Sequence, residues 1–294
     1  MSAPERPTRR SLLAEATPAL RAAGVPSPEY DADDLLAFVM GIGRSELVFV
    51  GAVGDDVAER FRALVARRAE RYPLQHLTGT ATFRYVDLAV GPGVFVPRPE
   101  TELLAGWAIE EARLVLADGA TPVVVDLCTG SGAIARSIVD EVPTAAVHAV
   151  ELSEDAFGWA ERNLAGTTVD LRHGDFATAF DDLLGTVDVV VCNPPYVPLE
   201  AWESVAVEAR EHDPHLALFS GDDGLDAIRV LAVRAAQLLR PGGVIGVEHA
   251  DVQGEAVPAV FAAAGAWEAI RDRRDLADRP RYLTARRVGA PTGR

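Results

Sequence analysis

The sequence has 294 residues, 49% of them hydrophobic, and a formal net charge of −16 at pH 7. This length supports a large core and two domains, and the acidic balance disfavours free nucleic acid, whose affinity depends on phosphate neutralisation by Lys and Arg. All 28 basic residues are arginine, which excludes a Schiff-base lysine, and Cys128 and Cys192 are too few for a disulfide framework or a zinc cluster.

The N-terminal stretch MSAPERPTRRSLLAEATPALRAAG lacks the continuous apolar core of a signal peptide. No apolar run elsewhere approaches the roughly 20 residues needed to span a bilayer. We therefore expect a cytoplasmic protein with no membrane contact, no metal and no direct contact with DNA. An acidic surface suits a basic protein partner better.

Residues 1–72 are predicted to form a small all-α domain. Apolar residues recur there at helical spacing, and Ser27 and Pro28 form an N-cap and first-turn pair that opens the second helix. The three apolar stripes comprise Leu12, Leu13, Ala16, Leu20 and Ala23; Leu35, Leu36 and Val39; and Val57, Phe61, Leu64, Val65 and Ala69.

Residues 73–98 alternate short apolar runs with Gly and Pro, which predicts a β-hairpin linker. A helix is expected after Pro99. Its predicted apolar face comprises Leu103, Leu104, Trp107, Leu114 and Val115.

Residues 99–294 are predicted to form an α/β domain, because apolar runs alternate there with helical patterns. Such a pattern indicates a mostly parallel sheet with helices on both faces. The last two strands lie close together in sequence, so one of them is expected to be antiparallel. The seven predicted strands are 122–127, 146–151, 169–172, 187–192, 243–248, 267–271 and 282–286.

A glycine loop, Cys128-Thr129-Gly130-Ser131-Gly132, follows the first of these strands. Two glycines allow a sharp turn and close approach to a ligand at the start of the next helix. Glu151 ends the second strand, where an acid can accept both ribose hydroxyls of a nucleoside. The spacing also fits a dinucleotide fingerprint, so an NAD(P) ligand remains open.

The third and fourth strands end in further polar and aromatic residues. Asp175 and Phe176 follow the third, where an acid can accept from an adenine amino group and an aromatic ring can stack on the base. Asn193-Pro194-Pro195-Tyr196 follows the fourth. The prolines hold the backbone extended and carry no N–H, so carbonyl and amide oxygens form a rigid acceptor pair for a planar –NH2 group.

Together, DLCTGSGAIA, the strand-end Glu151, GDF and NPPY resemble class I S-adenosylmethionine-dependent methyltransferases that act on planar nitrogen. The match is more specific to the HemK/PrmC release factor glutamine methyltransferases, and it covers nearly the whole chain. The segments that resemble this family are PLQHLTG (73–79), FVPRPETELL (95–104), NPPYVP (193–198), HDPHLALFSGDDGL (212–225) and VEHADVQGEAV (247–257).

The resemblance implies a Rossmann-like methyltransferase domain, S-adenosylmethionine as cofactor, and class I peptide-chain release factors as protein substrates, methylated on the Gly-Gly-Gln glutamine. It implies that the loop from Cys128 to Gly132 lines the methionine end of the cofactor, Glu151 takes the ribose, and Asp175 and Phe176 flank the adenine. The remaining assignments place Asn193, Pro194, Pro195 and Tyr196 on the glutamine amide, with Asn193, Pro194 and Tyr196 catalytic and Asn193 also near the cofactor.

Two positions depart from the family pattern, since Cys128 and Asp278 stand where glycine is usual. Glu248-His249 suggests a catalytic histidine, but we favour a strand-end acid and histidine, because methyl transfer requires no prior base. An adenine-N6 nucleic-acid methyltransferase and a non-catalytic protein that binds the cofactor remain alternatives.

Overall fold

The computed structural model describes residues 6–289, so the outermost ends of the two predicted domains lie outside the described residues. The chain divides into two compact units, one containing Met1–Thr80 with Ala206–His212 and the other Ala81–Val205 with Asp213–Arg294. The first unit continues past the predicted boundary at residue 72. The reason is a short helix, α4 (Leu74–Thr78), that buries Leu74 and Leu77 in the helical core.

The helical unit is built from α1 (Arg9–Ala22), α2 (Pro28–Met40), η1 (Arg44–Phe49), α3 (Asp55–Ala69) and α4. Pro28 occupies the first turn of α2, as predicted, although the Ser27 side chain makes no capping hydrogen bond. Each predicted stripe contributes buried residues, whereas Val39 is only half-buried. The buried members are Leu12, Ala16, Leu20, Leu35, Leu36, Phe61 and Val65.

A distant piece of chain completes this unit. Helix α8 (Val207–His212) brings Glu208, whose carboxylate accepts hydrogen bonds from Arg71 at 2.6 and 2.8 Å and from Arg68 at 3.1 Å. Arg68 is buried and also donates to Asp31 at 2.7 Å. A buried guanidinium requires such partners, because an unpaired charge in the core is costly.

The second unit contains the predicted seven-stranded sheet, in the order β5-β4-β3-β6-β7-β9-β8. Its strands are β3 (Val123–Asp126), β4 (Ala146–Glu151), β5 (Asp170–His173), β6 (Val187–Cys192), β7 (Leu239–Glu248), β8 (Trp267–Arg274) and β9 (Pro280–Arg287). The first five run parallel, and β9 pairs antiparallel with both β7 and β8.

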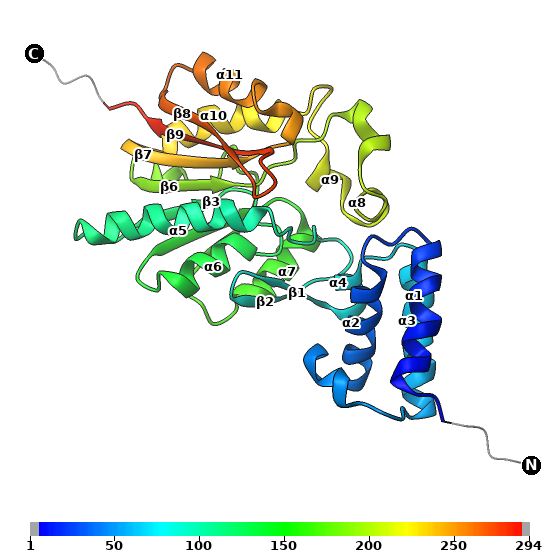
Figure 1. The fold of residues 1–294 in the computed structure, drawn as a ribbon. Coiled ribbons are helices and arrows are strands. Elements are labelled where there is room, and N and C mark those ends of the chain that lie inside the picture. The colour runs from blue at the N-terminus through cyan, green and yellow to red at the C-terminus, as the bar shows by residue number, and fades with distance from the viewer. Residues whose placement is uncertain (1–5, 290–294) are drawn as a thin grey trace, which may run out of the picture. The chain divides into compact units, whose positions relative to one another are not determined.

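Helices cover both faces of this sheet (Figure 1). One face packs against α5 (Thr101–Ala117), α6 (Ala133–Glu141) and α7 (Glu154–Leu164), and the other against α10 (Asp226–Leu238) and α11 (Ala256–Ala263). Every residue of β6 is buried, which explains the apolar run from Val189 to Cys192. The predicted apolar face of α5 was wrong at Leu114, which is 60% exposed. The helix buries Leu104, as predicted, and also Ala105, Ala108, Ile109 and Ala112.

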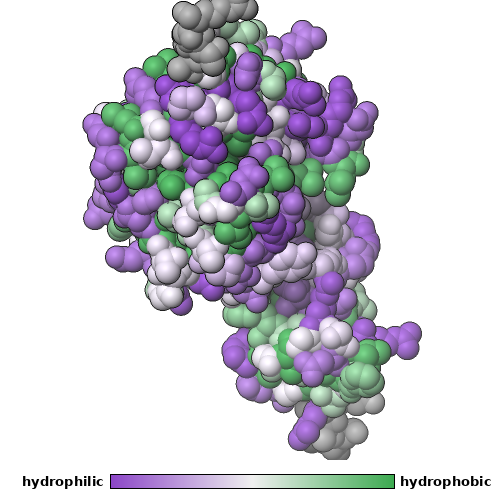
Figure 2. Space-filling model, turned by 90° about the vertical axis from the view of Figure 1, so that its left-hand side faces the viewer, coloured by the Kyte–Doolittle hydropathy of each residue, from purple (hydrophilic) through white to green (hydrophobic). Residues whose placement is uncertain are grey.

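The predicted hairpin is present as β1 (Thr80–Phe83) and β2 (Val86–Ala89). Shorter elements are α9 (His215–Leu218), η2 (Asp181–Leu183), η3 (Leu199–Ser204) and η4 (Asp251–Gln253). On the face shown in Figure 2, hydrophobic residues occur in small groups between hydrophilic ones. Within residues 6–289, no helix is both long and apolar enough to cross a membrane.

Candidate active site

The strand order reverses between β3 and β6, which is where open α/β sheets hold their ligands. Strands β4 and β5 extend from one side of β3, and β6 and β7 lie on the other. The Leu127 N–H donates to the Val191 carbonyl at 3.0 Å, so the two strands remain paired up to their carboxyl ends. The glycine loop after β3 and the Asn-Pro-Pro-Tyr segment after β6 therefore leave the sheet side by side.

The glycine loop turns sharply from β3 into α6. Gly130 has φ +56° and Gly132, at the N-cap of α6, has φ +84°, a region that side chains rarely adopt. A Cβ on Gly130 would meet nothing within 4 Å, so open space borders the loop there. Thr129 donates its hydroxyl proton to Asp126 at 2.7 Å and fixes the base of the turn.

Glu151 connects the glycine loop to β4. Its two carboxylate oxygens accept the backbone N–H of Gly130 and of Ser153, both at 2.8 Å. Each oxygen keeps a second lone pair, so the carboxylate can still accept from a ligand. At the end of β5, Asp175 is exposed and accepts the Ala177 N–H at 2.8 Å.

Carboxylates follow or end the three adjacent strands β3, β4 and β5: Asp126, Glu151 and Asp175. Asp126 is fully buried, and burial raises the pKa of its carboxyl to about 7. Its Oδ1 has no hydrogen-bond partner among the described residues. Because Asp126 is fully buried, Glu151 and Asp175 are the acceptors of this row that can reach ligand hydroxyls and amino groups. The half-buried Phe176 packs its apolar surface nearby, against the sheet core.

On the other side of the crevice, residues Asn193–Tyr196, called here the acceptor segment, are held by side chains that are distant in sequence. The Asn193 side-chain amide donates from Nδ2 to the Thr101 hydroxyl at 3.4 Å. The Tyr196 hydroxyl donates to Glu248 Oε1 at 3.2 Å, and the Tyr196 carbonyl accepts from Gln253 Nε2 at 3.0 Å. Pro194 and Pro195 have no N–H between these fixed points, so the segment presents acceptors.

Glu248 and His249 end β7 but face different neighbours. Glu248 is buried next to Tyr196, and burial raises the pKa of both the Glu248 carboxyl, to about 7, and the Tyr196 phenol. His249 is fully buried, with Nε2 3.0 Å from Asp272 and Nδ1 2.9 Å from the Ala250 carbonyl. Burial lowers the pKa of this imidazole, so we interpret His249 as a neutral core residue.

Residues 97–102, which read PRPETE, contain two side chains in ion pairs. Arg98 donates to the buried Asp213 at 2.7 Å, and burial raises the pKa of that carboxyl to about 6 despite the pairing. Glu100 lies 4.0 Å from Arg279. Nearby, Asp278 has φ +60°, a backbone conformation that glycine adopts without strain.

Sequence reasoning did not find Thr101, Gln253 or Asn163. From α7, Asn163 donates to the carbonyls of Ser131 and Ala89 at 2.8 and 2.9 Å and accepts the Ala89 N–H at 2.8 Å. It thereby ties the glycine loop to strand β2. An isolated Asn inside a helix carries no sequence pattern that would have identified this contact.

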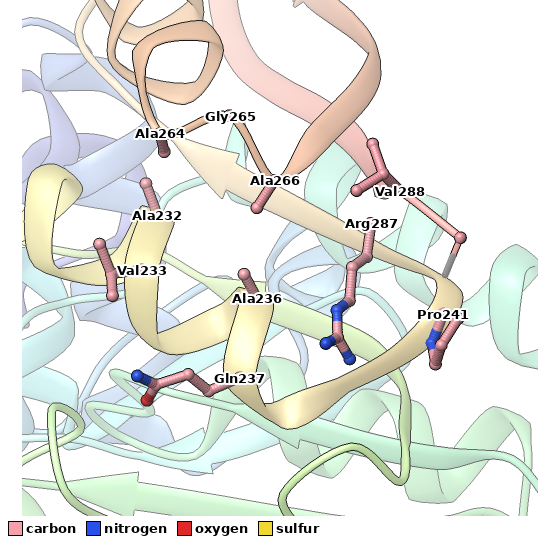
Figure 3. Close-up of a pocket in the computed structure, with 11 residues that line it drawn as sticks. Ala232, Val233, Ala236, Gln237, Pro241, Ala264, Gly265, Ala266, Arg287 and Val288 are labelled. Carbon is pink, nitrogen blue, oxygen red and sulfur yellow. The ribbon is translucent and has the colours of Figure 1, made fainter. Parts of the chain in front are cut away.

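A hollow of about 540 Å³ lies elsewhere, among α10, the α11–β8 turn and the end of β9 (Figure 3). Alanines from α10 and from the α11–β8 turn line it, with Arg287 and Val288 at the end of β9 and Pro241 near the beginning of β7. The candidate site is instead at the carboxyl ends of the parallel strands. The hollow therefore does not coincide with any predicted site residue.

Comparison with known proteins agrees with this geometry. The PrmC N-terminal domain family matches residues 11–79, and a methyltransferase domain family matches residues 124–212. Release factor glutamine methyltransferases from Streptomyces coelicolor and Mycolicibacterium smegmatis are 58% and 44% identical to this chain. The alignments cover 94% and 95% of this chain and 97% and 98% of those proteins. The chain belongs to the release factor glutamine methyltransferase family. It is therefore an enzyme that uses S-adenosylmethionine.

Two further proteins are similar to this chain but are named for other substrates. A 4-amino-L-phenylalanine/4-methylamino-L-phenylalanine methyltransferase from Streptomyces pristinaespiralis is 42% identical over 89% of each chain. The crystal structure of the hMettl16 catalytic domain with MAT2A 3'UTR hairpin 1 has a TM-score of 0.51 at 12% identity, over 83% of this chain and 84% of that one. The latter supports the methyltransferase fold alone, and this fold is the Rossmann-like one that was predicted.

Proposed function

We propose that this protein methylates the side-chain amide nitrogen (N5) of the Gly-Gly-Gln glutamine in class I peptide-chain release factors. The observation that carries the proposal is the rigid Asn193–Tyr196 acceptor segment beside the glycine loop, in a chain 58% identical to a release factor glutamine methyltransferase.

For the cofactor, we assign the loop Cys128–Gly132 to the methionine end, Glu151 to the ribose hydroxyls, and Asp175 and Phe176 to the adenine. The open space at Gly130 and the free lone pairs of Glu151 support these roles. When bound, S-adenosylmethionine supplies a methyl group activated by its sulfonium. The half-buried Cys128 side chain packs against the sheet core next to the loop.

For the substrate, Asn193 and Pro194 provide oxygens that accept both N–H bonds of the glutamine amide. An amide nitrogen is a poor nucleophile because its lone pair is delocalised, with an amide rotation barrier of about 18–20 kcal/mol as the scale of that conjugation. Acceptors fixed by the extended Pro194-Pro195 backbone draw the nitrogen toward a tetrahedral geometry. The lone pair then points at the activated methyl, which needs a separation of roughly 3–3.5 Å.

The helical unit is proposed to recognise the release factor away from the reactive loop. The predicted domain for this role is residues 1–72, and the compact unit of the structure continues to Thr80. Binding energy gained there can orient the amide. The net charge of −16 suits a basic partner in the cytoplasm.

A second candidate function is methylation of a small arylamine, because one relative at 42% identity is named for 4-amino-L-phenylalanine. An aromatic –NH2 is also planar and would fit the same two acceptors. We rank it second, since the release factor enzyme is the more similar relative, at 58% against 42% identity.

Mass spectrometry separates the candidates. A purified release factor, 4-aminophenylalanine and an adenine-containing oligonucleotide would each be incubated with the enzyme and S-adenosylmethionine. We expect one added methyl on the Gly-Gly-Gln glutamine and none on a release factor with Glu at that position. Methylation of the amino acid or oligonucleotide alone would reject the proposal, and cofactor binding without any product would indicate a non-catalytic role.

A further inference from the structure

We propose that Glu248 is a positioning residue for methyl transfer, which orients the Asn193 amide and the Tyr196 side chain as substrate acceptors. The inference rests on the proposed function. Glu248 is the last residue of β7, is 1% exposed, and accepts a hydrogen bond from Tyr196.

The direction of the hydrogen bonds supports this role. Tyr196 donates its hydroxyl proton to Glu248 Oε1 at 3.2 Å. The buried Oε2 has no hydrogen-bond partner among the described residues, and Thr101 is the neighbour that most lowers the Glu248 pKa, so we infer that the Thr101 proton is directed at this oxygen. An ionised carboxylate can only accept, so it takes the single proton of each hydroxyl. The Thr101 oxygen is then left as an acceptor.

Asn193 receives its orientation from that acceptor. Its Nδ2 lies 3.4 Å from the Thr101 oxygen and donates to it. If the amide were flipped, two lone-pair oxygens would face each other, because the Thr101 proton is already directed at Glu248. The Asn193 carbonyl oxygen is therefore turned away from Thr101 and free to accept an N–H from the substrate.

The ionised form of Glu248 is only weakly stabilised by its surroundings. Burial is the largest influence and raises its pKa to about 7, and Glu100 adds to the increase. Arg281 opposes it, but this guanidinium also donates to Asp275 at 3.2 Å. The groups that face Glu248 are Glu100 and Thr101 at the beginning of α5, Tyr196 after β6 and Arg281 on β9.

A pH dependence follows from this environment. Below about pH 7 the carboxyl gains a proton and becomes a donor at one oxygen, so one hydroxyl loses its acceptor. The orientation of Asn193 is then lost in a growing fraction of molecules. We expect kcat to fall on the acid side of neutrality, with cofactor affinity unchanged.

The test compares four variants with the wild type on a release factor substrate. Glu248→Gln should lower kcat roughly 10–100-fold and should remove the fall of kcat below pH 7, which is the acid limb of the pH profile. The S-adenosylmethionine Kd should stay within about twofold. Thr101→Val should lower kcat about 10-fold, whereas Thr101→Ser keeps the hydroxyl and should restore it. Asp188→Asn is the matched control, because this buried carboxylate bonds the Val123 N–H at 2.8 Å at the other end of β6. It should lower stability and keep the acid limb.

A second measurement needs no substrate. The Asn193 side-chain NH2 resonances should titrate near pH 7 in the wild type and not in Glu248→Gln. The role of Glu248 would be overturned if Glu248→Gln kept the wild-type kcat and its acid limb. It would also be overturned if the two Thr101 variants had equal kcat, or if the wild-type Asn193 NH2 signal did not titrate. A wild type that leaves the release factor unmodified would instead reject the proposed function, and the resonance titration would still decide the role of Glu248.

Discussion

The two sides of the crevice are built differently. On the cofactor side, Thr129 bonds Asp126 three residues away, and Gly130 bonds Glu151 at a separation of 21 residues. On the acceptor side, the partners of Asn193 and Tyr196 lie 92, 52 and 57 residues away in sequence.

The difference has a physical origin. A nucleoside ligand can be held by one turn and a carboxylate, which neighbouring βα units provide from short patterns. Two acceptors that must meet a planar amide need orientation in three dimensions, and a proline-rich strand exit cannot supply it alone. The acceptor side therefore uses α5, β7 and η4 as well.

The largest effect is expected at the acceptor itself. Asn193→Ala removes one of the two oxygens proposed to receive the substrate amide, so kcat should fall by about 10²–10³-fold. Single-turnover kinetics with saturating cofactor would measure it. Full activity in this variant would contradict the acceptor assignment. A loss confined to cofactor affinity would mean that Asn193 binds the cofactor and not the substrate amide.

On the cofactor side, a substitution should change the cofactor Kd and leave kcat nearly unchanged. Glu151→Gln replaces a charged acceptor by a neutral one, so the S-adenosylmethionine Kd should rise about 10–100-fold, because a hydrogen bond to a charged group contributes roughly 1.5–3 kcal/mol. Titration calorimetry would measure it, and kcat at saturating cofactor should change little. An unaltered Kd would exclude Glu151 as the ribose acceptor.

Asn163 tests whether long-range support also matters on the cofactor side. Asn163→Ala removes three hydrogen bonds, so the free energy of unfolding should fall by about 1–3 kcal/mol and the cofactor Kd should rise several-fold, up to about 10-fold. Denaturant unfolding and calorimetry would measure both. Asn163→Asp is the second variant: it keeps the acceptor for Ala89 but turns a carboxylate oxygen toward two carbonyl oxygens, so it should destabilise at least as much as Asn163→Ala. Equal Kd values in all three proteins would show that the loop holds its shape unaided.

The smallest effect is expected at Asp278, with φ +60°. Asp278→Gly removes side-chain strain but gives the unfolded chain more freedom, so the net gain should be a few tenths to about 1 kcal/mol. Thermal unfolding would measure it, with Asp278→Ala expected to lower Tm. Both variants should keep wild-type kcat. A changed kcat would mean that this turn influences the acceptor side through Arg281.

Local sequence patterns predicted the seven strands, the glycine loop and the acceptor segment, because each depends on a few consecutive residues. They failed where distant chain segments decide the outcome. Leu114 has helical spacing yet lies on the part of α5 that the sheet does not cover. The Thr101–Asn193 contact joins residues 92 apart, and no local pattern encodes such a pair.

The helical unit is discontinuous, and this has a consequence for synthesis of the chain. Arg68 and Arg71 leave the ribosome long before Glu208, which follows Arg71 by 137 residues. Until then Arg68 has Asp31 as its only carboxylate among these partners, and Arg71 has none. Although domains generally fold in the order in which they are made, this one begins first and can complete its ion pairs only after two-thirds of the protein has been translated.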